Sequence, residues 1–191
     1  MPGHKVRQMM KAERDLAEKR FRREKNKNLL STPGIHQCMI VLDHLKPTFN
    51  IGKIFRSADV FSVHQVHLVG IDFFDPAPGM GAFKWVPAMF HRDFFQCYTY
   101  LVNQGYTPFV LEPDKGEMIC DIQLPERSAF IFGHEEFGLS FDPSLYPDIR
   151  PLTIPQYGRT ESLNVSIAAS ITMYEYARQH NRCQNGGFSP K

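Results

Sequence analysis

The chain alternates between short apolar runs and segments whose apolar residues recur every three or four positions. Short apolar segments predict strands at residues 37–42, 65–70, 107–111, 128–133 and 152–154, and two of these are near-continuous apolar runs, as expected of strands buried on both faces. Helical spacing predicts helices at residues 50–61, 92–104 and 163–178. Because strands and helices alternate, we expect an α/β domain with a mostly parallel sheet flanked by helices, and ligands at the carboxyl ends of the strands.

The segment 152–178 places a polar corner between a strand and an apolar helix. Ser162 and Asn164 fall where the amides of a helix N-terminus are unpaired and where the helix dipole favours negative charge. A serine in this place usually only caps the helix. Apolar residues recur at helical spacing at Leu163, Ile167, Ile171 and Tyr174. Further residues widen this stripe, so we expect the helix to be buried on most of its circumference: Val165, Ala168, Ala169, Thr172 and Tyr176.

Residues 1–34 are predicted to form a basic helical arm that ends at a Ser-Thr-Pro-Gly sequence. Residues 1–27 hold ten basic and four acidic side chains (+6), whereas the rest of the chain holds 12 basic and 16 acidic ones (−4). This asymmetry indicates a polyanionic partner such as RNA. The candidate RNA-binding residues are Arg7, Lys11, Arg14, Arg20, Arg22 and Arg23. The alternative is a solvated helix with i,i+4 ion pairs, for which Asp15–Lys19 and Glu18–Arg22 qualify.

With 191 residues, the chain is long enough for one well-packed domain, which we assign to residues 35–183, followed by a flexible tail at 184–191. No apolar run is long enough to span a bilayer, and no signal-peptide pattern opens the chain. The four cysteines include no CxxC pair, which argues against a zinc site and fits reduced thiols. We therefore expect a cytoplasmic protein without a metal.

Two further segments combine a strand or helix end with polar residues. A helical segment places Asn50, Lys53 and Arg56 near one face, although a helix cap and a surface charge would explain them more simply. The loop after the strand 128–133 starts at Gly133, where the backbone can turn sharply or lie against a ligand. That loop has neither the GK[ST] of a phosphate-binding loop nor a GxGxxG pattern, so nucleotide sites of those kinds are disfavoured.

Taken together and in this order, three segments resemble the signature motifs of a known enzyme family. NIGKIFRSADVFSV, IFGHEEFGLS and IPQYGRTESLNVSIAA are similar to the three successive motifs of the SpoU (TrmH-like) branch of the SPOUT RNA methyltransferases. The resemblance covers residues 40–178. It implies a fold whose C-terminal part threads into a trefoil knot, S-adenosyl-L-methionine as methyl donor, a homodimer, and methylation of a ribose 2′-hydroxyl in RNA.

The resemblance also implies roles for individual residues. The catalytic positions of the family fall on Arg56, Glu135, Ser162 and Asn164, with support from Asn50. The cofactor pocket falls on the backbone of Leu111, Gly133, Ile154 and Leu163. Leu111 stands where relatives often carry a threonine, which removes a side-chain hydroxyl but leaves the backbone contacts possible.

The RNA substrate is less directly implied. Relatives that modify ribosomal RNA often carry a separate N-terminal RNA-binding domain, whereas this chain has only the basic arm, so transfer RNA is favoured. The loop at residues 79–85 matches the family least and is a candidate for substrate choice. Two alternatives stay open: an RNA-binding protein that keeps the fold without catalysis, and a SPOUT enzyme that methylates a base.

Overall fold

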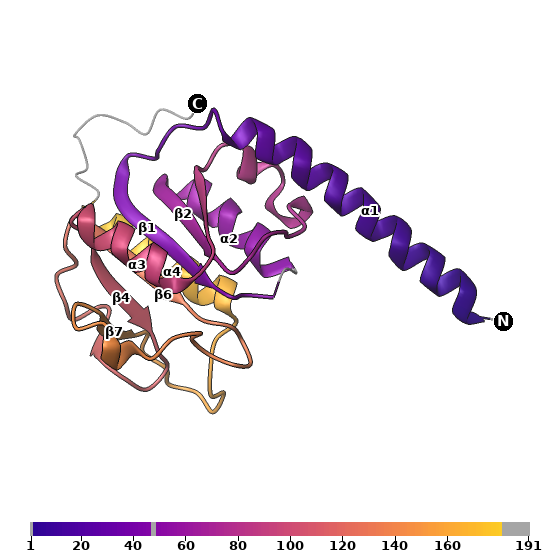
Figure 1. Cartoon of the computed structure of the whole chain (residues 1–191). Coiled ribbons are helices and arrows are strands. Elements are labelled where there is room, and N and C mark those ends of the chain that lie inside the picture. The colour runs from indigo at the N-terminus through magenta and orange to yellow at the C-terminus, as the bar shows by residue number, and fades with distance from the viewer. Residues whose placement is uncertain (1, 47–48, 181–191) are drawn as a thin grey trace.

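A computed structural model describes residues 2–46 and 49–180 of the chain (Figure 1). Seven strands form one parallel sheet in the order β3-β2-β1-β6-β4-β7-β5. The strands are β1 (His36–Asp43), β2 (Val63–Val69), β3 (Ala88–His91), β4 (Thr107–Leu111), β5 (Glu117–Met118), β6 (Ser128–Phe132) and β7 (Arg150–Thr153). The helices are α1 (Pro2–Asn28), α2 (Phe49–Val60), α3 (Phe94–Asn103) and α4 (Val165–His180), with single 3₁₀ turns η1 (Ala77–Gly79), η2 (Ala82–Lys84) and η3 (Pro143–Leu145). The predicted α/β class with a parallel sheet is confirmed.

The sheet has an apolar core on each face, because successive side chains of a strand point to opposite sides. On β1, Cys38, Ile40 and Leu42 belong to the core formed with α2 and α4. Met39 and Val41 belong to the core formed with α3. Helices α2 and α4 therefore lie against each other on one face of the sheet, and α3 covers the opposite face (Figure 1).

Helix α4 differs from the prediction in its start and in its buried face. The helix begins at Val165, so Ser162 lies in the preceding loop, and Asn164 caps the helix by accepting a hydrogen bond from the Ser166 amide at 2.9 Å. The expected burial on most of the circumference is confirmed, since only Ile167, Tyr174 and Arg178 of the helix are exposed. Part of the predicted stripe is nevertheless uncovered: Leu163, Ile167 and Tyr174 are exposed, while the face with Ala169, Thr172, Met173 and Tyr176 is buried. Helical spacing identifies an apolar stripe without showing what covers it.

The sequence pattern missed β3 and β5. The side chains of β3 are half-buried at one edge of the sheet, and β5 consists of two exposed residues at the other edge. Strand β3 has only a three-residue apolar run directly after Pro87 and β5 has none, so neither shows the longer run that marks a strand buried on both faces. The remaining strands and helices were predicted to within a few residues of their ends.

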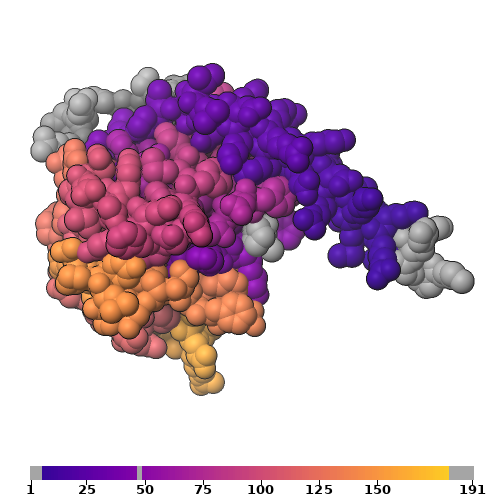
Figure 2. Space-filling view, viewed as in Figure 1, coloured from indigo at the N-terminus to yellow at the C-terminus, as the bar shows by residue number. Residues whose placement is uncertain are grey.

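Helix α1 consists of a docked C-terminal half and a free N-terminal half that projects from the body (Figures 1 and 2). Phe21 anchors the docked half, since it is buried with its ring centroid between 5.3 and 6.2 Å from four other rings, those of Phe73, Phe74, Phe83 and Phe90. Asn28 is also buried and its side-chain amide donates to the carbonyl oxygens of Phe83 and Val86 at 2.5 and 2.6 Å. These contacts hold the helix at a fixed angle to the body.

The loop that carries η1 and η2 lies between α1 and α2. Gly79 of this loop approaches Gly52 of α2 so closely that a Cβ on Gly79 would lie 2.8 Å from the Gly52 carbonyl oxygen. Because Phe83 of the same loop packs against Phe21, the arm is coupled to α2 through this loop. Trp85, at the end of the loop, is exposed.

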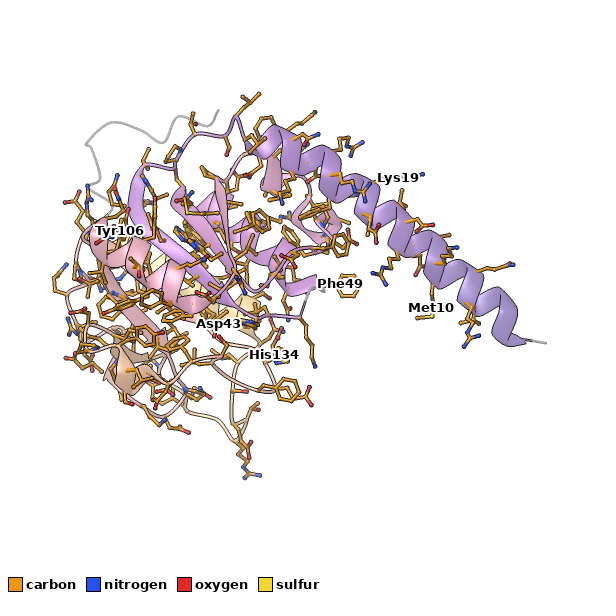
Figure 3. All side chains as sticks on the ribbon, in the orientation of Figure 1. Met10, Lys19, Asp43, Phe49, Tyr106 and His134 are labelled. Carbon is orange, nitrogen blue, oxygen red and sulfur yellow. The ribbon has the colours of Figure 1, made fainter. Side chains whose placement is uncertain are left out.

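The free half of α1 exposes all its side chains from residue 6 to residue 16. Val6, Met9, Met10 and Leu16 are its exposed apolar residues, and Arg7, Lys11 and Arg14 are its exposed cations. Figure 3 shows Met10 on the side of α1 toward Phe49 and Lys19 on the side away from it. The free half therefore presents both basic and apolar surface to the solvent.

No helix among the described residues is long and apolar enough to cross a membrane. The cysteines within these residues, Cys38, Cys97 and Cys120, are free. Cys183 and the tail 184–191 lie outside the described part of the chain.

A histidine pair is buried between β2, β3 and α3, on the α3 side of the sheet. His67 Nδ1 lies 2.9 Å from His91 Nε2, the distance of an N–H···N hydrogen bond, and 3.8 Å from the sulfur of Cys97. These three residues are the one group of metal-ligating type found in the described residues. Burial lowers the pKa of His67 from 6.5 to about 3, so the pair is held together by a neutral hydrogen bond at physiological pH.

The free energy of unfolding should fall as the pH drops below about 6.5. A buried histidine with a lowered pKa binds fewer protons in the folded chain than in the unfolded chain, so acid favours unfolding, by about 1.4 kcal/mol per pH unit for one such group. His64 and His91, whose pKa values burial also lowers, contribute a loss of the same sign. Urea unfolding between pH 7.5 and 5.0 measures this slope, and His67→Phe should reduce it. A slope that His67→Phe leaves unchanged would contradict the assignment.

Candidate active site

A cavity of about 850 Å³ opens at the carboxyl ends of β4, β6 and β7. Such a position is the usual ligand site of a parallel α/β sheet, and the volume suits a small organic molecule. Apolar side chains from these strand ends and from the start of α4 form much of the wall, at Leu111, Phe132, Ile154, Leu163, Val165 and Ala168. Polar residues at the mouth include His134, Glu135, Ser162 and Asn164.

The loop after β6 forms one wall of the cavity as a small closed hairpin. The His134 and Gly138 backbones exchange two hydrogen bonds, at 2.7 and 2.9 Å. His134 Nδ1 also accepts hydrogen bonds from the amides of Glu136 and Phe137. Gly133 is required here, because a Cβ at this position would lie 2.7 Å from the Gly138 backbone. The loop is therefore shaped by its own backbone contacts.

Two residues, one at the end of β1 and one between β1 and α2, hold this hairpin in place. Asp43, at the end of β1, is fully buried, and its carboxylate accepts hydrogen bonds from the amide and hydroxyl of Ser140 at 2.6 and 2.7 Å. Lys46 forms an ion pair with Glu136 at 2.8 Å. The hydrogen bond between these side chains raises the pKa of Lys46 and lowers the pKa of Glu136, so both stay charged near neutral pH.

A chain of hydrogen bonds joins three distant segments at the mouth of the cavity. The side-chain amide nitrogen of Asn50 donates to Glu135 Oε1 at 2.8 Å, and Asn50 Oδ1 accepts from the side-chain amide nitrogen of Asn164 at 3.3 Å. Asn164 Oδ1 in turn accepts from the backbone amide and the hydroxyl of Ser166 at the start of α4. This chain connects α2, the loop after β6 and the N-terminus of α4.

Most of the residues predicted for the site come together. Leu111, Gly133, Ile154 and Leu163 all line the cavity, as do Glu135, Ser162 and Asn164, and Asn50 is hydrogen-bonded to two of these. Arg56 does not line the cavity: it is exposed on α2, six residues beyond Asn50. The six basic residues predicted for RNA all lie on α1, and one of them, Arg20, forms an ion pair with Asp75 of the body.

No sequence motif or pattern pointed to Asp43 and Lys46. Asp43 is the last residue of an apolar strand, and only its complete burial shows that it needs partners. Lys46 lies in a segment without helical or strand periodicity, and its partner Glu136 is 90 residues away in the chain. Pairs of this kind are visible only in the folded structure.

Residues 37–174 match the model of the SpoU rRNA Methylase family. This chain belongs to that family. The matched region contains every residue of the cavity wall and of the hydrogen-bonded chain.

Named relatives within the SpoU family act on two kinds of RNA. The chain is 29% identical over 146 residues to tRNA (guanosine(18)-2′-O)-methyltransferase of Thermus thermophilus, covering 73% of this chain and 74% of the relative. It is 28% identical over 156 residues to the 23S rRNA (guanosine-2′-O-)-methyltransferase RlmB of Nitrosomonas europaea, covering 79% of this chain and 60% of the relative.

The fold also matches a solved structure, the S-adenosylmethionine-bound rRNA methyltransferase of Sinorhizobium meliloti. The TM-score is 0.67 at 23% identity, and the match covers 81% of this chain and 60% of that chain. This chain thus spans about three fifths of the length of that protein and of the N. europaea relative.

The cavity of this SpoU-family chain fits S-adenosyl-L-methionine, the cofactor of the family. Apolar side chains of Leu111, Ile154 and Leu163 can enclose the adenine, and backbone groups beyond the strand ends can recognise its edge. The absence of a side chain at Gly133 lets the hairpin backbone at Gly138 pack against the end of β6, which sets the shape of this wall of the cavity.

Gly133→Ala should weaken binding of S-adenosylmethionine at least tenfold, because the new Cβ must displace the Gly138 backbone and thereby the hairpin wall. Isothermal titration calorimetry measures the affinity, and circular dichroism checks that the variant is folded. Gly158→Ala is the matched control, since a Cβ at Gly158 meets no atom within 4 Å. Equal affinities for a folded Gly133→Ala variant and this control would refute the role of Gly133.

Proposed function

We propose that this S-adenosylmethionine-dependent RNA 2′-O-methyltransferase modifies a ribose in structured RNA, with transfer RNA favoured over ribosomal RNA. The observation that supports the proposal most is the hydrogen-bonded chain of Glu135, Asn50 and Asn164 at the mouth of the cavity. It gathers polar residues of three separate motifs where a ribose beside the cofactor would lie. The preference for transfer RNA is supported by the basic arm and by the T. thermophilus relative.

In the proposed mechanism, the protein acts mainly by positioning the ribose. S-adenosylmethionine supplies an electrophilic methyl group on sulfur, and the 2′-oxygen must lie in line behind it. Ser162 and Asn164 would bind the ribose or a neighbouring phosphate next to the N-terminus of α4. Glu135, fixed by Asn50, would hold the loop after β6 against the substrate.

Arg56 would stabilise the negative charge that develops on the 2′-oxygen as its proton leaves to a neighbouring group or to water. A guanidinium group is effectively always protonated, which favours this electrostatic role over that of a general base. Arg56 lies beside the contact of α2 with α4, where Ser57 and Ser170 are hydrogen-bonded at 2.8 Å. In a dimer built on this face, Arg56 would lie at the edge of the interface, within reach of the RNA.

The proposed homodimer is supported by the uncovered apolar surface of α4. Ile167 and Tyr174 are exposed on that helix, and Val60 is exposed at the end of the adjacent α2. Side chains of this size on one face are typical of a surface that a second subunit covers. The interface would explain why the apolar stripe of α4 continues beyond the part buried in its own subunit.

We also propose that the C-terminal segment forms the trefoil knot of SPOUT proteins. The chain enters the loop after β6, passes through β7 at the far side of β4, and returns as α4 to pack beside α2 and β1. Strand β6 lies between β1 and β4, so this return crosses strands that were placed earlier in the chain. Such threading is a rare exception to the rule that chains do not pass through their own loops.

Transfer of a labelled methyl group tests the activity directly. Incubation with tritiated S-adenosylmethionine and unmodified transcripts of transfer and ribosomal RNA should label transfer RNA more strongly, at a 2′-oxygen that then resists alkaline cleavage. Labelling without that resistance would indicate a base-methylating enzyme. Absence of labelling in both RNAs, with intact RNA binding, would indicate a binding protein without catalysis.

Arg56→Ala should lower kcat at least a hundredfold and leave the affinity for S-adenosylmethionine within about twofold, because Arg56 lies outside the cavity wall. Arg92→Ala, which removes another exposed arginine on a different part of the body, is the control. A variant that keeps more than a tenth of the wild-type kcat, a loss of only about 1.4 kcal/mol, would exclude the proposed role.

The basic side chains of the free half of α1 should bind RNA phosphates without reading sequence. Replacing Arg7, Lys11 and Arg14 by glutamine should weaken RNA binding and flatten the slope of log K against log salt by roughly two to three. The docked half stays intact in this variant, which avoids exposing the aromatic cluster around Phe21. An unchanged slope would refute the role of the arm, and Met9→Gln with Met10→Gln on the same helix controls for loss of apolar surface.

A further inference from the structure

Two phenylalanine side chains are exposed next to residues that build the cavity mouth. Phe49 is 66% exposed and Phe137 is 76% exposed. Phe49 directly precedes Asn50, and Phe137 follows Glu135 by two residues, so the hydrogen bond between Asn50 and Glu135 brings both segments together. Figure 3 shows the Phe49 ring projecting from the edge of the body into the solvent.

Phe137 is held in a defined position although its ring is solvent-exposed. Its amide donates to His134 Nδ1 at 3.2 Å, and its ring centroid lies 4.7 Å from that of His134, which lines the cavity. The two backbone hydrogen bonds between His134 and Gly138 close the hairpin on either side. A ring presented in this way loses little conformational freedom when a ligand contacts it, which favours binding.

The charged groups of this hairpin are already engaged within the protein. Glu136 is paired with Lys46, and Glu135 accepts the amide of Asn50. The two carboxylates of the hairpin do not attract a phosphate, whereas the exposed ring of Phe137 is available for a stacking contact.

A nucleobase is the group whose chemistry fits that surface. If the ribose of the target nucleotide enters the site beside Ser162 and Asn164, its base extends outward from the cavity mouth. Every base has a π-face, and stacking on aromatic side chains binds unpaired bases without selecting their sequence.

We propose that Phe49 and Phe137 form an aromatic clamp that stacks on the nucleobase of the target nucleotide and thereby sets the position of its 2′-oxygen. The clamp rests on the proposed function, since it assumes that the site methylates a ribose. It adds a subsite for an unpaired base, so the target nucleotide lies in a loop or is turned out of its helix.

Phe49→Ala and Phe137→Ala should each lower kcat/KM for RNA roughly 5- to 100-fold, the range expected for loss of one stacked base. The affinity for S-adenosylmethionine should stay within about twofold. Phe137→Trp should retain most of the wild-type activity, because it keeps an aromatic face. Phe95→Ala is the matched control: Phe95 is also 66% exposed, and it lies on α3, which contributes no residue to the cavity wall.

The assay uses the full chain, the RNA that the wild type methylates best, and light scattering to follow the oligomeric state. Wild-type activity together with unchanged kcat/KM in both alanine variants would overturn the clamp and leave the proposed function standing. Dissociation of a wild-type dimer by either variant would also overturn it, because the rings would then belong to a subunit interface. A wild type that methylates no RNA would instead refute the proposed function on which the clamp rests.

Discussion

The carboxylate of Asp43 is buried at the end of β1, an interior strand of the sheet, where a charge without partners would be costly. Ser140 provides those partners through its amide and hydroxyl, 97 residues further along the chain. Because Ser140 ends the hairpin after β6, satisfying Asp43 fixes that hairpin relative to β1 and to the helix α2 that follows. The ion pair of Lys46 with Glu136 and the hydrogen bond of Asn50 with Glu135 extend the same connection toward the cavity.

This connection explains how a polar site can be built from segments that lie far apart in the chain. The parallel sheet brings the ends of β4, β6 and β7 to one edge, but it does not determine the course of the loops that leave them. The backbone contacts of His134 and Gly138 shape one loop, and the Asn164 cap fixes the start of α4. Asn50 then needs only two side-chain hydrogen bonds to join them.

The basic arm belongs to the same rigid unit, although it projects from the body. Phe21 and Asn28 attach it to the loop around Phe83, and that loop packs against α2 through Gly79 and Gly52. The free half of α1, about 15 residues at 1.5 Å each, reaches roughly 20 Å beyond this attachment. RNA bound along the arm would therefore be held at a set distance from the cavity.

The sequence by itself determined the α/β class, the five main strands, the family and a third of the cavity residues, because apolar runs and short motifs report local structure and local chemistry. It did not determine the edge strands β3 and β5, whose apolar runs are short or absent, or which part of the apolar stripe of α4 stays uncovered. Only the tertiary structure decided that Asp43 and Lys46 support the site and that Arg56 lies outside the cavity wall. These facts depend on contacts between residues far apart in the chain, and no local pattern encodes which distant side chain will satisfy a buried charge or cover an apolar stripe.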